Sequence, residues 1–113
     1  MSEKKLTIIR QGDVVIIPAD SEFVQKLFGM NFDNMFTYDV HIVIHGEEHD
    51  HELKGNYKAC ILGEDMYFVD IENAELKHPE HGNVQLPKGK YIIMRIFDWL
   101  RRIARFGRTR RFD

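Results

Sequence analysis

The sequence is poor in the residues and runs that define several protein classes. Its single cysteine, Cys60, excludes an internal disulfide framework and a cysteine-rich zinc finger. No apolar run approaches the ~18 residues that cross a bilayer, and no secretory signal opens the chain. Glycine-rich phosphate loops and Gly-x-Ser-x-Gly elbows are also absent. We therefore expect a protein of the reducing cytoplasm, without a membrane span, that is neither a P-loop enzyme nor a serine hydrolase.

What the chain does contain suits one globular domain. Its 113 residues are 43% apolar and 30% charged, which argues against global disorder. The net charge of −2 conceals an asymmetry, because residues 1–98 carry −7 and residues 99–113 carry +5. We expect a β domain over residues 1–98, followed by a basic tail over residues 99–113 that is not a separate domain.

Short apolar stretches with strand periodicity recur along the chain, separated by turn residues about every 8–12 positions. The predicted strands cover residues 6–10, 13–17, 38–45, 49–54, 57–62, 66–71, 74–77 and 91–98. Residues 20–29 and 98–106 have helical spacing instead. This pattern predicts a mainly β fold, a small antiparallel β-barrel or sandwich with one short helix and a C-terminal helix.

Six histidines are the chemically informative residues, and four of them lie within eleven positions. Neutral imidazole is the commonest protein ligand for zinc, iron, nickel and copper. Positions i and i+2 of a strand point the same way, so His49 and His51 can bind one ion together. The charged residues Asp50 and Glu52 alternate with them, which predicts that both histidines point inward. The same alternation directs His41 and His45 outward, into solvent.

Further ligands must come from another segment, and His78 and His81 flank a Pro-Glu pair in a predicted loop. We predict a site for a divalent metal (zinc, iron, nickel or manganese) with the ligands His49, His51, His78 and His81. Additional carboxylate candidates are Glu47, Glu48 and Glu80. Two alternatives stay open: inward histidines that only hydrogen-bond to backbone groups, and a metal-free site that uses histidine as an acid or base.

The C-terminal tail has an apolar stripe flanked by arginines. Trp99, Ile103 and Phe106 follow an i, i+4, i+7 spacing, with Leu100 beside them. We expect this stripe to be buried on the chain's own body or on a second copy, as a homo-oligomer formed through residues 99–113. Nucleic acid is a disfavoured partner because the acidic body repels phosphates.

Four segments together resemble a family of short, uncharacterised bacterial and phage proteins. The segments are Arg10-Gln11-Gly12-Asp13-Val14, Gly46-Glu47-Glu48-His49-Asp50-His51, His78-Pro79-Glu80-His81-Gly82 and Leu86-Pro87-Lys88-Gly89-Lys90-Tyr91. The family carries Gly-Glu-x-x-His-x-His, His-x-Glu-His and Leu-Pro-x-Gly-x-Tyr motifs. The resemblance implies no activity, but it pairs the His49/His51 motif with His78 and His81. The chain departs from the family at residues 94–98, where the family usually has Gln-Arg-Glu-Tyr.

A looser similarity is to cupins, small β-barrels that bind a metal through a His-x-His step. Cupins place a glutamate four or five residues later, where this chain has Gly55 and Asn56. The similarity therefore implies a fold, and His78 or His81 would have to replace the missing ligand.

Two functions follow from these observations. The first is a small β-barrel protein that binds a divalent metal through its His-x-His pocket, with a small-molecule ligand and with catalysis undecided. The second is a non-enzymatic interaction or assembly protein, a phage or accessory factor, that uses its basic C-terminal helix.

Overall fold

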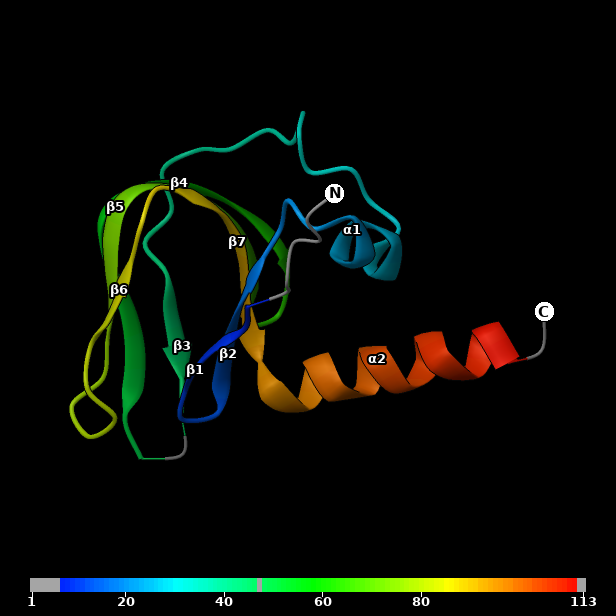
Figure 1. Ribbon diagram of the computed structural model, residues 1–113. Helices are drawn as coiled ribbons and strands as arrows, with labels where there is room; N and C mark the ends of the chain where they lie inside the picture. Colours follow the sequence, from blue (N-terminus) through cyan, green and yellow to red (C-terminus); the bar gives the residue numbers. More distant parts are fainter. Residues whose placement is uncertain (1–6, 47, 112–113) are drawn as a thin grey trace.

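Antiparallel strands make up most of the structure, a computed structural model that describes residues 7–46 and 48–111, with side chains through residue 106. Figure 1 shows the sheet with both helices on one side of it. The elements are β1 (Ile9–Gln11), β2 (Val14–Pro18), α1 (Glu22–Phe28), β3 (Val43–His45), β4 (Asp50–Gly63), β5 (Met66–Lys77), β6 (Val84–Leu86), β7 (Gly89–Arg95) and α2 (Ile96–Arg111).

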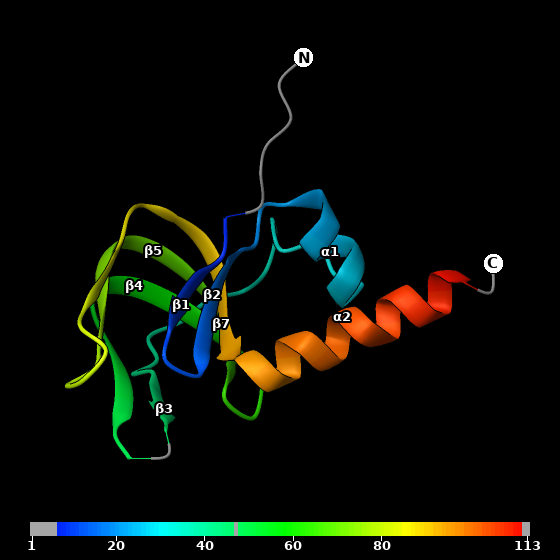
Figure 2. The ribbon, with the colours of Figure 1, turned by 60° about the horizontal axis from the view of Figure 1, so that its bottom comes forward.

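All paired strands run antiparallel in one seven-stranded sheet. Its hydrogen-bonded order is β1-β2-β7-β5-β4-β3, and β6 pairs with the far end of β5. The sheet is curled, so that Val14 and Ile16 of β2 share one apolar cluster with Ile44 of β3 at the far end of the strand order. The path does not close on itself. The predicted mainly β, antiparallel architecture is thus confirmed, as an open curled sheet (Figures 1 and 2).

The apolar residues of β2 divide between two cores on opposite faces of the sheet. Val14 and Ile16 face the inside of the curl, whereas Val15 and Ile17 face the helices, and all four are buried. A strand that is covered on both faces loses the alternation of polar and apolar residues. This two-sided burial explains why the sequence reads as an uninterrupted apolar run at this point.

The long strands β4 and β5 correct one part of the predicted topology. The sequence suggested a turn at Gly55 and Asn56, but β4 continues through them and pairs with β5 along most of its length. Gly55 has φ +132°, and a Cβ at this position would lie 2.4 Å from the carbonyl oxygen of Asn73. The glycine therefore permits a close approach of two backbones, just before a register shift between Asn56 and Tyr57.

Both helices pack on the outer face of the sheet. Ser21 caps the start of α1 by accepting a hydrogen bond from the backbone N–H of Val24, and Gly29 ends the helix in the left-handed conformation. Helix α2 begins at Ile96, two residues earlier than expected, and the predicted strand over residues 91–98 ends at Arg95 instead. No helix in the described part of the chain is both long and apolar enough to span a bilayer.

The apolar stripe of α2 packs against the body of the same chain. Trp99 is buried, and Ile103 and Phe106 are half-buried against the outer core. The ring of Phe106 meets the ring of Phe23 edge-on at 5.9 Å, and the guanidinium of Arg102 lies 4.2 Å from the ring centroid of Phe28. The prediction that protein covers the stripe is confirmed for Trp99 and in part for the other two side chains.

Trp99 is expected to anchor α2. Replacing it with alanine should lower the free energy of unfolding by about 3–5 kcal/mol, because a large buried side chain leaves a cavity in the outer core. The matched control is Leu100→Ala. Leu100 follows Trp99 in the same helix but its side chain is exposed, so this change should alter stability by less than about 0.5 kcal/mol. Urea denaturation followed by circular dichroism measures both, and equal effects would contradict the packing described for α2.

Candidate functional site

The structure brings the four predicted histidines together at one end of the curled sheet. His49 comes from the turn before β4, His51 from β4, and His78 and His81 from the loop between β5 and β6. The ring centroid of His78 lies 4.5 Å from that of His51, 4.5 Å from that of His81 and 5.8 Å from that of His49. The predicted approach of the two histidine segments is confirmed, with His78 at the centre.

His51 is completely buried, as predicted, and both of its ring nitrogens face oxygen atoms. Nδ1 lies 2.8 Å from Oε1 of Gln11, and Nε2 lies 2.9 Å from Oδ1 of Asp13. The amide nitrogen of Gln11 donates to the carbonyl oxygens of Leu76 and Gly82, which leaves Oε1 as the acceptor. Nδ1 of His51 therefore donates to Gln11, and a second hydrogen lies between Nε2 and the carboxyl group of Asp13.

His49 is more open than the sequence suggested. It precedes the first paired residue of β4, and its carbonyl oxygen accepts the N–H of Gly46 in the turn. Because it lies in a turn, it does not follow the strand alternation that buries His51, and its side chain is 41% exposed. The prediction that His49 is mostly buried therefore holds only in part, because the residue is half-buried. Its Nε2 lies 2.8 Å from Oε1 of Glu80.

The neighbours of the histidine motif follow the predicted alternation. The side chain of Asp50 is 54% exposed and that of Glu52 is 35% exposed. His41 and His45 are exposed as expected, and each contacts one of these carboxylates across the outer surface.

His78 is held by its own loop. Its Nδ1 accepts hydrogen bonds from the backbone N–H groups of Glu80 and His81, both at 3.1 Å. Burial lowers the pKa of His78 below its usual value, and the imidazoles of His51, His81 and His49 lower it further. The neutral ring then carries its hydrogen on Nε2, because Nδ1 is occupied as an acceptor.

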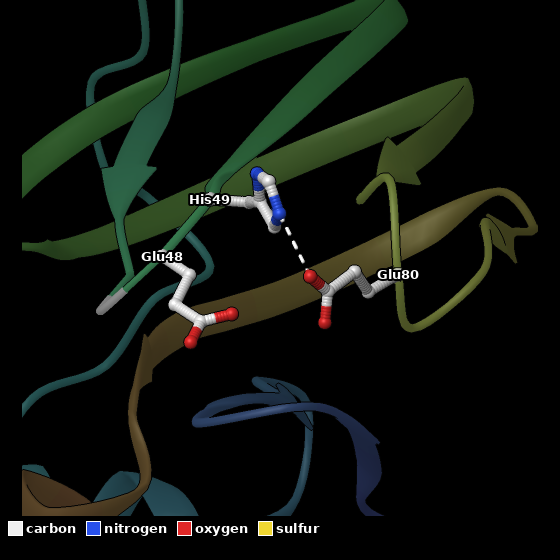
Figure 3. A group of neighbouring side chains, drawn as sticks. All are labelled: Glu48, His49 and Glu80. Atoms are coloured by element: carbon white, nitrogen blue, oxygen red, sulfur yellow. Dashed lines mark hydrogen bonds and ion pairs between the residues drawn. The ribbon is translucent and has the colours of Figure 1, made fainter.

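Two carboxylates complete a group that can hold a metal ion. Glu48, His49 and Glu80 each offer one ligand atom, and these atoms lie within 4.8 Å of one another. Figure 3 shows Glu48 and Glu80 approaching from the two loops, with the ring of His49 above them. The sequence offered both glutamates only as additional candidates. The third carboxylate candidate, Glu47, lies outside the described residues.

A cleft of about 460 Å³ opens in front of this group. Its lining includes Arg10, Gly12, Asp13, Glu48, His49, Glu80, His81, Arg95 and Phe97. Two features favour glycine at position 12 in the wall of the cleft. Gly12 has φ +58°, and a Cβ on it would lie 2.6 Å from the ring of His81.

Sequence reasoning missed the partners contributed by the β1–β2 hairpin. Gln11 and Asp13 bind His51, and Arg10 lines the cleft, whereas the sequence indicated a role for this segment only through the family resemblance. The available signal was a polar residue, Gln11, at the end of a β-branched strand. Arg95 was missed as well, because its position at the mouth of the cleft depends on the curl of the sheet.

One family model matches the chain, a domain of unknown function (DUF8820), over residues 10–96. The chain belongs to this family. The resemblance to an uncharacterised family is thus confirmed in general terms, and the matched region contains all the histidines and glutamates of the cluster. Neither the curated proteins nor the solved structures contain a match, so the similarity to cupins gains no support from them.

The buried amide of Gln11 is expected to hold the site together. Gln11→Ala leaves Nδ1 of His51 and two backbone carbonyls without their partner, and each unsatisfied buried group costs about 1–3 kcal/mol. Thermal and urea denaturation should therefore show a loss of at least about 1 kcal/mol. The matched control is Gln85→Ala, an exposed glutamine on β6, which should change stability little. An unaffected Gln11→Ala protein would contradict the role of this network.

Proposed function

We propose that the protein binds one divalent metal ion through Glu48, His49 and Glu80 at the open end of the curled sheet. The observation that carries this proposal is the proximity of the three ligand atoms, all within 4.8 Å. Two carboxylates and one imidazole suit zinc, iron(II), manganese or nickel. Such a group also leaves coordination positions for water or a small molecule from the cleft.

The four histidines of the sequence prediction would then have different roles. His49 is a ligand. His81 is exposed and lines the same cleft, so it is the candidate for a fourth ligand. His78 offers no lone pair to a metal, because its Nδ1 accepts two backbone hydrogen bonds and its Nε2 carries the hydrogen. His51 is buried behind the cleft and is bound by Gln11 and Asp13, so it stabilises the structure around the site.

The hydrogen bonds of His78 and Gln11 favour a site whose ligands are already in position before a metal ion binds. The N–H groups that bind Nδ1 of His78 belong to Glu80 and His81, so the buried ring fixes the backbone of a proposed ligand. Gln11 ties the same loop to β1 through the carbonyl oxygen of Gly82. Residues that orient ligands in this way are usually important for metal affinity.

Metal titration of chelator-treated protein tests the proposal. Isothermal calorimetry with zinc, and separately with manganese, should give one ion per chain. His49→Ala and Glu80→Gln should each weaken binding by more than about tenfold, because a direct ligand matters at least as much as the residues that orient it. The matched control is His41→Ala, since His41 is equally a histidine paired with a carboxylate but lies on the outer surface.

The proposal fails if the wild-type protein takes up no ion. It also fails if His41→Ala weakens binding as much as His49→Ala does, because the ion would then be bound nonspecifically by surface histidines.

Assembly through α2 is the second candidate function. Phe97 and Leu100 are 67% and 54% exposed on this basic helix, which leaves apolar surface for a second copy of the chain. If this function holds, light scattering should show a metal-independent dimer for the wild-type protein and a monomer for Leu100→Glu. Truncation of residues 99–113 is a poorer test, because it also removes the buried Trp99. A wild-type monomer would exclude the self-assembly form of this candidate.

A further inference from the structure

The cleft in front of the proposed metal group combines charges of both signs. Arg10 and Arg95 reach it from β1 and from the end of β7, and Asp13, Glu48 and Glu80 face the same space. With no cation bound, the carboxylates outnumber the guanidinium groups. The cleft of the metal-free protein is therefore unfavourable for a negatively charged ligand.

Some of these charges are already compensated within the protein. Asp13 contacts Nε2 of His51 at 2.9 Å, in a buried pair away from the proposed ligands. Glu80 contacts Nε2 of His49 at 2.8 Å, but the proposed metal ion would replace that contact. Arg95 donates from Nε to Asp65 at 3.1 Å and from Nη2 to the carbonyl oxygen of His45. The charges of Glu48, Glu80 and Arg10 therefore decide whether the cleft favours a cation or an anion.

Arg10 is the cation with unused donors. Its Nε donates to the carbonyl oxygen of Gly12 at 2.6 Å, which holds the guanidinium against the β1–β2 turn. Among the described residues, no hydrogen bond or ion pair involves its two terminal nitrogens. A guanidinium fixed in this way presents paired donors that match the oxygens of a carboxylate or phosphate.

From these charges we infer that the metal-loaded cleft binds a small anion, with its carboxylate or phosphate group between the metal ion and Arg10. The inference rests on the proposed function, because a divalent cation is needed to neutralise Glu48 and Glu80. Once they are neutralised, Arg10 gives the cleft a positive charge, and the open coordination positions of the metal accept an oxygen of the anion.

The shape and surroundings of the cleft limit the size of this ligand. A volume of about 460 Å³ is in the range of pockets for small molecules. Phe97 is 67% exposed and lines the cleft, so it offers an apolar surface to the body of the ligand. The charge of −7 on residues 1–98 opposes an extended polyanion such as a nucleic acid, whereas a single acid group meets only the cleft.

Cobalt(II) provides the test, because its visible absorption reports both metal uptake and a change of ligand. The cobalt-loaded protein is titrated with inorganic phosphate and, separately, with succinate, which distinguishes the two kinds of acid group. In the wild-type protein at least one of these titrations should shift the cobalt spectrum. Calorimetry with the same anions on metal-free protein should give binding weaker by at least roughly tenfold.

Variants of Arg10 then test the second contact. Arg10→Gln should bind cobalt within about twofold of wild type but should need at least roughly tenfold more anion, because a charge-assisted hydrogen bond is lost. Arg10→Lys keeps the charge and should restore most of the affinity, which controls for a local folding defect. The matched control is Arg101→Gln, an arginine outside this cleft, which should behave like wild type.

The possible failures are distinguishable. If cobalt produces no protein-bound spectrum, the proposed function fails and the inference fails with it. If cobalt binds but neither anion shifts the spectrum, or if Arg10→Gln responds to the anion as wild type does, metal binding stands and the inference is overturned.

Discussion

The candidate site depends on one buried hydrogen-bonding side chain, the amide of Gln11. It joins the end of β1 to β5, to the loop that carries Glu80 and to the ring of His51. These segments are far apart in the sequence, and β1 is an edge strand of the sheet. An amide that is 2% exposed has no access to water, so its three hydrogen bonds form together or leave costly unpaired groups. Through this constraint the hairpin and the loop hold a fixed relative position.

The two-sided burial of the sheet explains how a chain of this size supports an open polar cleft. One apolar cluster fills the inside of the curl, and a second lies between the outer face and the two helices. The polar cluster sits at the mouth of the inner core, where strand ends and loops meet. Burial of apolar surface on both faces offsets the cost of ordering these polar loops.

The sequence predicted the elements well where a local pattern decides the structure. The alternation in residues 40–45 correctly directed Ile42 and Ile44 inward and His41 and His45 outward, although only Val43–His45 of the strand predicted over 38–45 is a strand. The helix predicted over residues 20–29 is α1, which Ser21 caps and Gly29 ends. The errors arose where a contact between distant segments decides the outcome. Gly55 suggested a turn, but it allows β4 to approach β5 closely. Helix α2 begins at Ile96, within a stretch whose composition suits a strand.

The site itself was predictable only in part, and for the same reason. Histidine spacing was enough to select the right segments, since all four rings come together. It could not show that Nδ1 of His78 is occupied by backbone donors or that His49 lies in a turn, because both depend on loop conformation. Asp13 and Gln11 carry no metal-binding spacing of their own, and their roles follow from the curl that brings β1 to β4.

The contact between Gly12 and His81 has a consequence for how sequences with this fold can diverge. The ring of His81 lies where a side chain at position 12 would begin, so position 12 can gain a side chain only if that ring moves or is replaced by a smaller one. A larger residue at position 12 requires a smaller or displaced one at position 81, together with a turn that tolerates the altered backbone. The two positions should therefore covary among homologues, and a chain that lacks glycine at the first should also lack histidine at the second.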